Sequence, residues 1–343
     1  MASFLLAGLT LRRLRDPSLV ELNEIDLDTV PAWLTRAFLS SANLRSVLHM
    51  VITGCKGITA DHMAAVCSRA PKLGQLRVQN CPRFRCDSLR LPVLHTLNLR
   101  NADIDGEAAK ALVLGCPQLA VMHFEGCSCN AAGNLGSDTL TEASFVCCGG
   151  LTDAATRAFA SRCPALRSLD LSECTELRAP TFLGLAQLEA LRLEVCGALT
   201  ALADLDQDCP KLRDLSVAYC HNLREASWPA TLRRANLTNT QLEDASLTLL
   251  CQRCRATLEE LVARSCELLR APVLCGDALS RLDVSDCAQL TSSTIEQAVA
   301  NSASLTFLDA RGCAIDGELA SSGSTTADGA NGRPLEILRD PPQ

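Results

Sequence analysis

The chain has 343 residues with a formal net charge of −7, and it contains 59 leucines and 20 cysteines but only 11 aromatic residues. An acidic balance with so few aromatic side chains argues against a basic groove or a stacking platform for nucleic acid. No stretch of the sequence approaches the roughly 18 apolar residues that span a bilayer, so we expect neither a membrane span nor a membrane partner.

The first segment, Met1–Leu11, is short and apolar, and its basic residues Arg12, Arg13 and Arg15 follow it. A secretory signal places positive charge before the apolar stretch and a small-residue cleavage site after it. We therefore interpret this segment as an opening structural repeat and expect a cytoplasmic or nuclear protein. Disulfides are rare in those reducing compartments, so the abundance of cysteine needs another explanation.

A nine-residue pattern accounts for 25 of the 59 leucines and half of the cysteines. The pattern is L-x-x-L-x-L-x-x-C with apolar substitutes, and Leu166, Leu169, Leu171 and Cys174 form a clean copy. Successive copies are 20 to 26 residues apart, and after the first two steps long and short steps alternate. A period of this length is typical of leucine-rich repeats. The ninth position falls at residues 30, 55, 81, 102, 127, 148, 174, 196, 220, 240, 266, 287 and 313.

We therefore predict an α/β fold, a right-handed leucine-rich-repeat solenoid of horseshoe shape with a parallel sheet on its concave side. Side chains of a strand alternate in direction, so the two leucines of each L-x-L enter the interior and the residue between them faces outward. A single repeat cannot bury its leucines alone, so stability comes from stacked neighbours. The ninth-position cysteines are expected to fill the turn after each strand as small buried side chains.

The residues between strands predict convex helices that alternate with short irregular segments. The long steps contain helix-like stretches, several of which begin after a side chain suited to a helix N-cap. The short steps leave too little chain for a helix, and three of them contain an internal proline, at Pro92, Pro180 and Pro272. The expected helices are Asp61–Arg69, Glu107–Leu114, Asp153–Ser161, Ala245–Cys251 and Ser293–Ala300.

The repeat array is predicted to cover residues 1–317, with about 13 repeats that are clearest between residues 20 and 315. Beyond it, Ser321–Arg333 is rich in small polar residues, so we expect residues 318–343 to form a flexible C-terminal tail. Within this tail, Leu335–Leu338 either packs back on the last coil or has no structural role.

Signals for metal binding are isolated. Cys251 and Cys254 form the only C-x-x-C, and no second pair at zinc spacing follows. Asp204, Asp206 and Asp208 match the first ligands of a calcium loop, but the glycine and the final glutamate of such a loop are missing. We expect packing cysteines, a solvated acidic turn, and neither a metal nor a cofactor.

His123 is the only histidine at a central outward strand position, and Ser144 is predicted beside it in the next repeat. Nucleophilic catalysis by such a pair needs a carboxylate that orients the histidine, and the pattern places none there. We therefore predict no enzyme and interpret His123 as a surface residue. A catalytic site built on His123 is the alternative.

The outward strand positions are where we expect binding, because solenoids present extended concave surfaces to their partners. These positions are polar, with arginines near one end and carboxylates near the middle. We predict a monomer that binds a protein partner on this face. The predicted binding residues are Arg77, Asn98, Arg100, His123, Glu125, Asp170, Glu173, Arg192, Glu194 and Tyr219.

Several repeats resemble a known class. The segments CKGITAD (55–61) and CGGLTD (148–153), the latter with CP at 163–164, resemble the cysteine-containing leucine-rich repeats of F-box/leucine-rich-repeat proteins and the antagonist-of-mitotic-exit family. The resemblance covers roughly residues 20–315. It implies an array that binds a protein substrate while a separate F-box recruits a Skp1/cullin ubiquitin ligase.

No F-box is recognisable in this sequence, so a Skp1/cullin complex is expected only if an F-box is supplied. The prediction is a substrate-recognition subunit or adaptor of an SCF-type ubiquitin ligase. The alternative is a ligase-independent scaffold or inhibitor that sequesters a protein partner. Fold alone does not decide between these roles.

Overall fold

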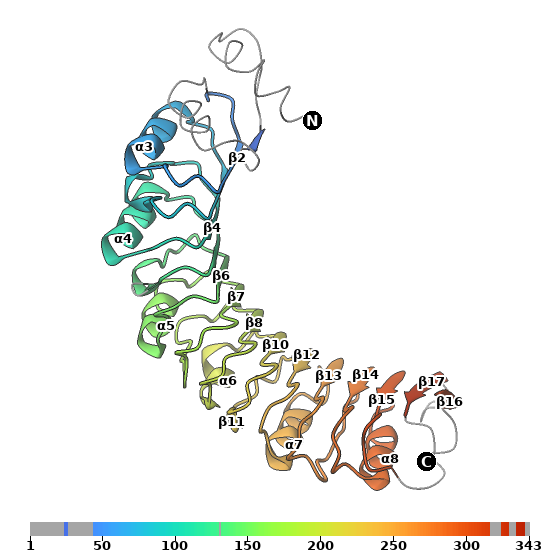
Figure 1. The fold of residues 1–343 in the computed structure, drawn as a ribbon. Coiled ribbons are helices and arrows are strands. Elements are labelled where there is room, and N and C mark those ends of the chain that lie inside the picture. Colours follow the sequence, from blue (N-terminus) through green and yellow to red (C-terminus); the bar gives the residue numbers. More distant parts are fainter. Residues whose placement is uncertain (1–23, 27–43, 130–131, 316–323, 329–333, 340–343) are drawn as a thin grey trace. The chain divides into compact units, whose positions relative to one another are not determined.

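The computed structural model describes residues 24–26, 44–129, 132–315, 324–328 and 334–339. The chain divides into two compact units, unit 1 (Met1–Leu166) and unit 2 (Arg167–Gln343). In each unit, short strands alternate with helices or irregular segments, and the helices lie on the opposite side of the repeats from the strands (Figure 1). The predicted α/β class with stacked parallel strands is confirmed. The right-handed sense and the horseshoe shape stay predictions.

The strands of unit 1 form a parallel sheet in strict register. Met50, Leu76, Leu97, Met122 and Ala143 lie side by side on consecutive strands, and all five are buried. This is the interior column that the second leucine position predicts. The strands are β1 (Glu24–Asp26), β2 (His49–Thr53), β3 (Gln75–Gln79), β4 (Thr96–Arg100), β5 (Val121–Glu125) and β6 (Glu142–Val146).

The long repeats of unit 1 contain the predicted helices, and the short repeats contain only a 3-10 turn. The helices are α3 (Ala60–Arg69), α4 (Gly106–Gly115) and α5 (Asp153–Ala160), and the turns are η1 (Cys86–Ser88) and η2 (Ala132–Asn134). Helix α4 begins at a well-formed cap, because the carboxylate of Asp105 accepts from the amides of Glu107 and Ala108 at 3.0 and 2.8 Å.

Unit 2 repeats the same plan with shorter strands. Leu169, Leu191, Leu215, Leu261 and Leu282 occupy the second leucine position, and each is at most 3% exposed. The parallel strands are β7 (Ser168–Asp170), β8 (Ala190–Arg192), β10 (Asp214–Ser216), β12 (Arg234–Asn236), β13 (Glu260–Val262), β14 (Arg281–Asp283) and β15 (Phe307–Asp309). A separate two-stranded sheet joins β9 (Ala201–Leu202) and β11 (Glu225–Ala226).

Two helices of unit 2 match the sequence prediction, and one replaces a predicted turn. The expected helices are α7 (Asp244–Arg253) and α8 (Ser292–Ala300). Where we expected a solvated acidic turn, α6 (Leu205–Asp208) forms a short helix. Asp206 pairs with Arg253 at 3.0 Å, and Asp208 accepts from the amide of Phe182 at 2.9 Å. Two of the three aspartates therefore hold neighbouring segments together, and the expectation of a merely solvated turn was wrong.

The sheet of unit 2 continues beyond the predicted array. Strand β17 (Pro334–Leu338) lies parallel to β15, and β16 (Ser324–Asp328) is antiparallel to β17. Leu335 and Ile337 are 0% and 5% exposed, because their strand spacing continues the apolar interior. Residues 334–339 are therefore packed on the last coil, which is one of the two alternatives given for Leu335–Leu338, and the flexible tail predicted for residues 318–343 does not hold for them. The rest of that tail and the Met1–Leu11 segment lie mostly or wholly outside the described residues.

The ninth-position cysteines do more than fill space. Where a thiol of this column donates to the preceding repeat, its acceptor is the main-chain carbonyl of the residue at the third leucine position of that repeat. Cys220 donates to the carbonyl of Leu193 at 2.9 Å, and Cys287 donates to that of Ala263 at 3.0 Å. The thiol therefore satisfies a carbonyl where the strand ends, which leucine or alanine cannot do. The same contact joins Cys127 to Leu99, Cys148 to Phe124, Cys196 to Leu171, Cys266 to Leu237 and Cys313 to Val284.

All 20 cysteines are free thiols. Four of them lie near the end of the segment that precedes a strand, and burial raises their pKa: to about 11 for Cys116 and Cys254, and to about 12 for Cys163 and Cys209. Because the thiolate is the reactive form, these buried thiols are poor nucleophiles at neutral pH. Their role is packing, as the sequence predicts.

Candidate functional site

Each strand exposes alternate side chains on the side away from the leucine interior, and we call these positions the outer face. In β3, for example, Leu76 and Val78 are buried while Gln75 and Arg77 are exposed. Equivalent positions of neighbouring strands are in register. Side chains from successive repeats therefore form rows across the outer face of each unit.

The five predicted residues of unit 1 come together on this face. Arg77, Asn98 and His123 are register neighbours on β3, β4 and β5, and Arg100 pairs with Glu125 at 3.0 Å. Arg77 is held within its own strand, because the Gln79 amide, with its oxygen turned toward Arg77, accepts from Nε and Nη2 at 2.7 Å. The Oδ1 atom of Asn98 is buried and has no hydrogen-bond partner among the described residues.

His123 contacts a carboxylate that the sequence pattern did not reveal. Its Nε2 lies 2.8 Å from Oε1 of Glu142, which occupies the first position of β6. The expectation that nothing orients this histidine was wrong, because Glu142 reaches diagonally across the repeats. Ser144 is the register neighbour of His123, but among the described residues no hydrogen bond joins the two. The arrangement orients an imidazole without assembling a nucleophile–base pair.

In unit 2, four predicted residues lie on or beside β7 and β8, and two serines link them. Asp170 accepts from the amide and hydroxyl of Ser172 at 3.0 and 2.6 Å, and that hydroxyl accepts from the amide of Glu194 at 3.2 Å. Glu194 in turn accepts from the hydroxyl of Ser216 at 2.7 Å. Ser172 and Ser216 were not predicted as site residues. The chain of contacts fixes Asp170 and Glu194 across three repeats.

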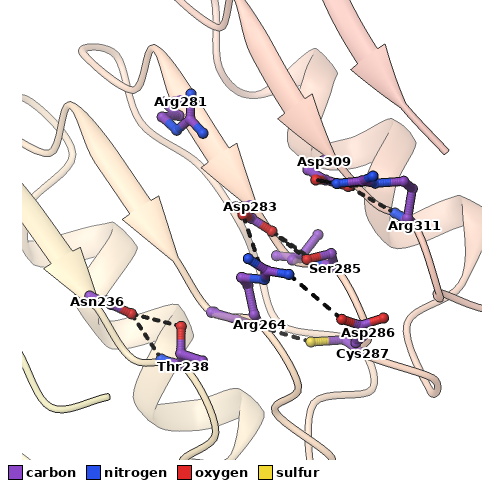
Figure 2. A network of polar contacts seen from close by, with 12 residues as sticks. Asn236, Thr238, Arg264, Arg281, Asp283, Ser285, Asp286, Cys287, Asp309 and Arg311 are labelled. Carbon is purple, nitrogen blue, oxygen red and sulfur yellow. Dashed lines mark hydrogen bonds and ion pairs between the residues drawn. The ribbon is translucent and has the colours of Figure 1, made fainter. Parts of the chain in front are cut away.

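The contact between Asp170 and Ser172 recurs farther along unit 2 (Figure 2). Asn236 accepts from the amide and hydroxyl of Thr238 at 3.2 and 2.7 Å. Asp283 accepts in the same way from Ser285 at 3.1 and 2.7 Å. The signal was visible in the sequence as D-x-S or N-x-T at the end of a strand, because such side chains hydrogen-bond the backbone two residues on.

The last copy of this contact uses an arginine. Asp309 accepts from the amide of Arg311 and, through both oxygens, from its guanidinium at 2.9 and 2.6 Å. Burial raises the pKa of Asp309, but the hydrogen bonds and charge of Arg311, with the charge of Arg264, outweigh it and lower the pKa below its ordinary value. Arg264 also lies 3.9 Å from both Asp283 and Asp286 (Figure 2).

A row of alternating charges crosses the first outward positions of β10 to β15. Asp214 accepts from Arg234 with Nη2–Oδ2 at 2.9 Å, and Glu260 pairs with Arg281 at 3.2 Å. The Arg281 guanidinium lies over the ring of Phe307, 4.1 Å from its centroid. Hydrogen bonding to Asp214, and the negative charges around it, raise the pKa of Arg234. Phe307 is thus an aromatic residue of the outer face that was not among the predicted binding residues.

A hollow of about 400 Å³ opens on the outer face over β8, β10, β12 and β13. Ala190, a small side chain at an outward position, leaves room for it, and charged side chains surround it. Arg234 forms an ion pair with Asp214. Arg192 and Glu194, by contrast, have no ion-pair partner among the described residues. The hollow therefore presents one positive and one negative group without ion-pair partners among the described residues, Arg192 at the end of β8 and Glu194 two residues later.

Glu173 and Tyr219 do not lie on strands. The structure places them at the bend directly after β7 and β10, with φ of 61° and 62°. The amide of Glu173 donates to the carbonyl of Glu194 at 2.7 Å, and that of Tyr219 donates to the carbonyl of Thr238 at the same distance. Both side chains are exposed, so they border the outer face instead of standing on it.

Other kinds of site were sought in the same residues. No helix in the described part of the chain is long and apolar enough to cross a membrane. Among the residues that the structure describes, no three or more His, Cys, Asp and Glu side chains are placed to hold a metal ion. That the protein works without a metal or cofactor stays a prediction.

Comparison with known proteins adds little to this description. No family model and no curated protein sequence matches the chain. Among solved structures, 143 chains match. One of them is in the crystal structure of the Rad7 and Elc1 complex in yeast: it is 16% identical, with 98% of this chain and 86% of that chain covered and a TM-score of 0.48.

Proposed function

We propose that this chain is a protein-recognition module that binds its partner on the outer face. The observation that carries the proposal is the order of that face. Charged and polar side chains of successive repeats stand in register, and contacts such as Asp170–Ser172 and Asp309–Arg311 hold them in place. Groups that are already fixed lose little freedom on binding. Complementary charge on a partner then gives specificity.

The hollow in unit 2 supplies the place where a partner side chain can be seated. Arg192 is exposed, Glu194 is partly exposed with one oxygen bonded to the Ser216 hydroxyl, and both are available for ion pairing with a partner that brings the opposite charges. A guanidinium such as that of Arg192 binds a carboxylate through two parallel hydrogen bonds. A partner carboxylate at Arg192 is therefore the contact we expect to matter most for affinity.

Binding rather than catalysis is the role that the chemistry supports. The pair of His123 and Glu142 lacks a hydrogen-bonded nucleophile among the described residues, and the buried thiols have raised pKa values. Nucleophilic catalysis needs both an activated nucleophile and a base within reach. We accordingly propose that the protein is not an enzyme.

At a finer level, we propose that the partner is a substrate and that the chain serves an SCF-type ubiquitin ligase as recognition subunit or adaptor. The support is the resemblance of the repeats to the cysteine-containing class, together with the thiol–carbonyl contacts that give cysteine a reason to stand at the ninth position. Co-purification of a Skp1-like adaptor and a cullin is the expected result. Their absence, with the partner retained, favours the scaffold or inhibitor.

Charge reversal tests the recognition role. Proteins that co-purify with the wild-type chain are quantified by mass spectrometry beside Arg192→Glu and the matched control Lys211→Glu, an exposed lysine of the same unit. We expect the partner to fall at least tenfold with Arg192→Glu, about the loss of one charged contact, and to remain with the control. Equal recovery from both variants contradicts binding at the hollow. Denaturant midpoints of the purified variants confirm that both are folded.

A further inference from the structure

The bends after the strands share one unusual backbone conformation. In each repeat from β2 to β15, the residue directly before the ninth position has a positive φ. Glycine adopts this conformation freely, asparagine and aspartate tolerate it, and a β-branched residue in it is an outlier. The residues at this bend position are Gly54, Asn80, Asn101, Gly126, Cys147, Glu173, Val195, Tyr219, Asn239, Ser265, Asp286 and Gly312.

Val195 and Tyr219 are the two large apolar residues of this row, and they follow neighbouring strands. Their φ values are 60° and 62°. The amide of Val195 donates to the carbonyl of Ala218, the residue before Tyr219, at 2.8 Å. The two residues therefore stand side by side at one edge of the outer face of unit 2, next to the hollow that Glu194 lines.

The stability of the fold does not explain why Val195 and Tyr219 occupy these two bend positions. They are 47% and 48% exposed, and among the described residues the side chain of Tyr219 has neither a hydrogen bond nor a ring contact. Asparagine or glycine, as at Asn239 or Gly312, is less strained in the same conformation. Strained residues that the fold does not require are typical of functional sites, and tyrosine is typical of the residues that dominate binding energy at interfaces.

The charges beside this pair define what it can accept. Glu173 occupies the same bend one repeat earlier, and Glu194 directly precedes Val195. Neither carboxylate has an ion-pair partner among the described residues. The positive group of this strand, Arg192, lies two residues before Glu194, on the hollow side. The border of Val195 and Tyr219 is therefore apolar with two free negative charges.

We infer that Val195 and Tyr219 anchor a protein segment that lays an apolar side chain across them and sets a lysine or arginine against Glu173 and Glu194. The inference rests on the proposed function and deepens it, because it names the chemistry of the bound segment. A basic and apolar segment satisfies both the exposed apolar area and the uncompensated carboxylates.

The probe is a library of displayed linear peptides, selected on the full chain. We expect enriched peptides to carry a large apolar residue beside lysine or arginine. Their affinity is then measured by fluorescence anisotropy for wild type, Val195→Asn, Tyr219→Asn, Glu173→Lys and the control Val273→Asn. The exposed fraction of Val273, 42%, is similar to the 47% of Val195, but Val273 has no positive φ.

We expect each of the three test variants to weaken binding at least tenfold and the control to change it less than twofold. The denaturant midpoints of Val195→Asn and Tyr219→Asn should equal or exceed that of wild type, because asparagine relieves the strained bend. Affinity that falls while stability is kept or rises separates a binding role from a structural one.

Three results overturn the inference. Selected peptides that bind all variants equally, or that are enriched in aspartate and glutamate, show that the anchor or its charge preference is wrong. No enrichment at all shows that no linear segment of this kind is bound. In each case the charge reversal at Arg192 tests the recognition function independently. Failure of this inference can therefore be told apart from failure of the proposed function.

Discussion

The strands of unit 1 and unit 2 differ in length although their interiors follow one pattern. Strands β2 to β6 have five residues each, whereas β7, β8, β10, β12, β13, β14 and β15 have three. In β7, β12, β14 and β15 of unit 2, the central outward residue is Asp or Asn, and it accepts from the backbone amide two residues later. That amide is then not available to the sheet.

In these four strands a side chain takes up a backbone amide that a longer strand could use, whereas β8, β10 and β13 are equally short and carry Arg192, Ser216 and Val262 at this position. Short polar side chains offer the backbone an alternative to the sheet ladder. In unit 1 the central positions are Val51, Arg77, Asn98, His123 and Ser144, none of which accepts from the amide two residues on, and the strands extend further. These two sets of strands therefore share one interior pattern and differ in strand length and in the polar contacts of their outer faces.

Charge separates the two units as well. Residues 44–166 contain 12 Lys and Arg against 9 Asp and Glu, a net charge of +3, whereas residues 167–315 contain 14 against 20, a net charge of −6. Because charge steers association, this difference in net charge favours binding of a charged partner to one unit over the other. The hollow and the apolar border both belong to the acidic unit.

The largest expected effect tests whether the interiors are alike. Leu97→Ala in unit 1 and Leu215→Ala in unit 2 each remove a buried leucine from the same column, at 0% and 3% exposure. We expect each to lower the free energy of unfolding by about 2–5 kcal/mol, as measured by denaturant titration. A cost below about 1 kcal/mol in one unit only would show that the two interiors differ.

The buried contacts of the outer face in unit 2 come next. Asp309→Ala leaves Arg311 without its carboxylate and should cost about 1–3 kcal/mol. Because the pKa of Asp309 is lowered in the folded state, its contribution is fully present above the unfolded pKa of about 4 and is lost as the pH falls through the folded value.

Denaturant titrations at pH 7 and below pH 4 check this prediction. The stability difference between wild type and Asp309→Asn should shrink as the pH falls through that range. A difference that stays constant with pH would contradict the charged Asp309–Arg311 contact. The exposed ion pair of Arg100 and Glu125 in unit 1, removed by Arg100→Ala, is the comparison for this buried contact.

A smaller effect tests the thiol column. Cys220→Ala removes a contact of 2.9 Å to the carbonyl of Leu193, whereas Cys127→Ala removes one of 3.7 Å to that of Leu99. We expect the first to cost about 1 kcal/mol more, the net worth of a buried hydrogen bond. Equal costs for both variants would mean that the column acts by packing alone.

The smallest effect concerns the exposed ion pair of unit 1. Arg100 and Glu125 are 3.0 Å apart, with side chains about half exposed. Removing either should change stability by less than about 1 kcal/mol, and less again in high salt. A double-mutant cycle in low and high salt measures this coupling. A coupling that salt does not reduce would indicate a contact more buried than this one.

The repeats could be predicted because their signals are local. Leucine at alternate positions and cysteine three residues later identify each strand and the turn after it. The convex helices follow from the alternation of long and short steps. By contrast, the packing of β17 could be given only as one of two alternatives, because Leu335 and Ile337 follow a long polar stretch and lack the nine-residue pattern.

The site was only half predictable, because its contacts join repeats. The rows of the outer face follow from strand alternation, and all ten predicted residues lie on or beside it. The pairing of His123 with Glu142 depends on the reach of two side chains across neighbouring strands. The positive φ of Val195 opposes the preference of valine itself, so no propensity could have placed it at a bend.

The central claim, that partners bind the outer face, is tested most directly by hydrogen exchange of the full chain with and without its captured partner. We predict that the partner slows exchange in β7 to β13 and in the bends that follow them. The helices α3, α5 and α7 should exchange at unchanged rates. Protection confined to the helices, with none in the strands and bends, would contradict the account.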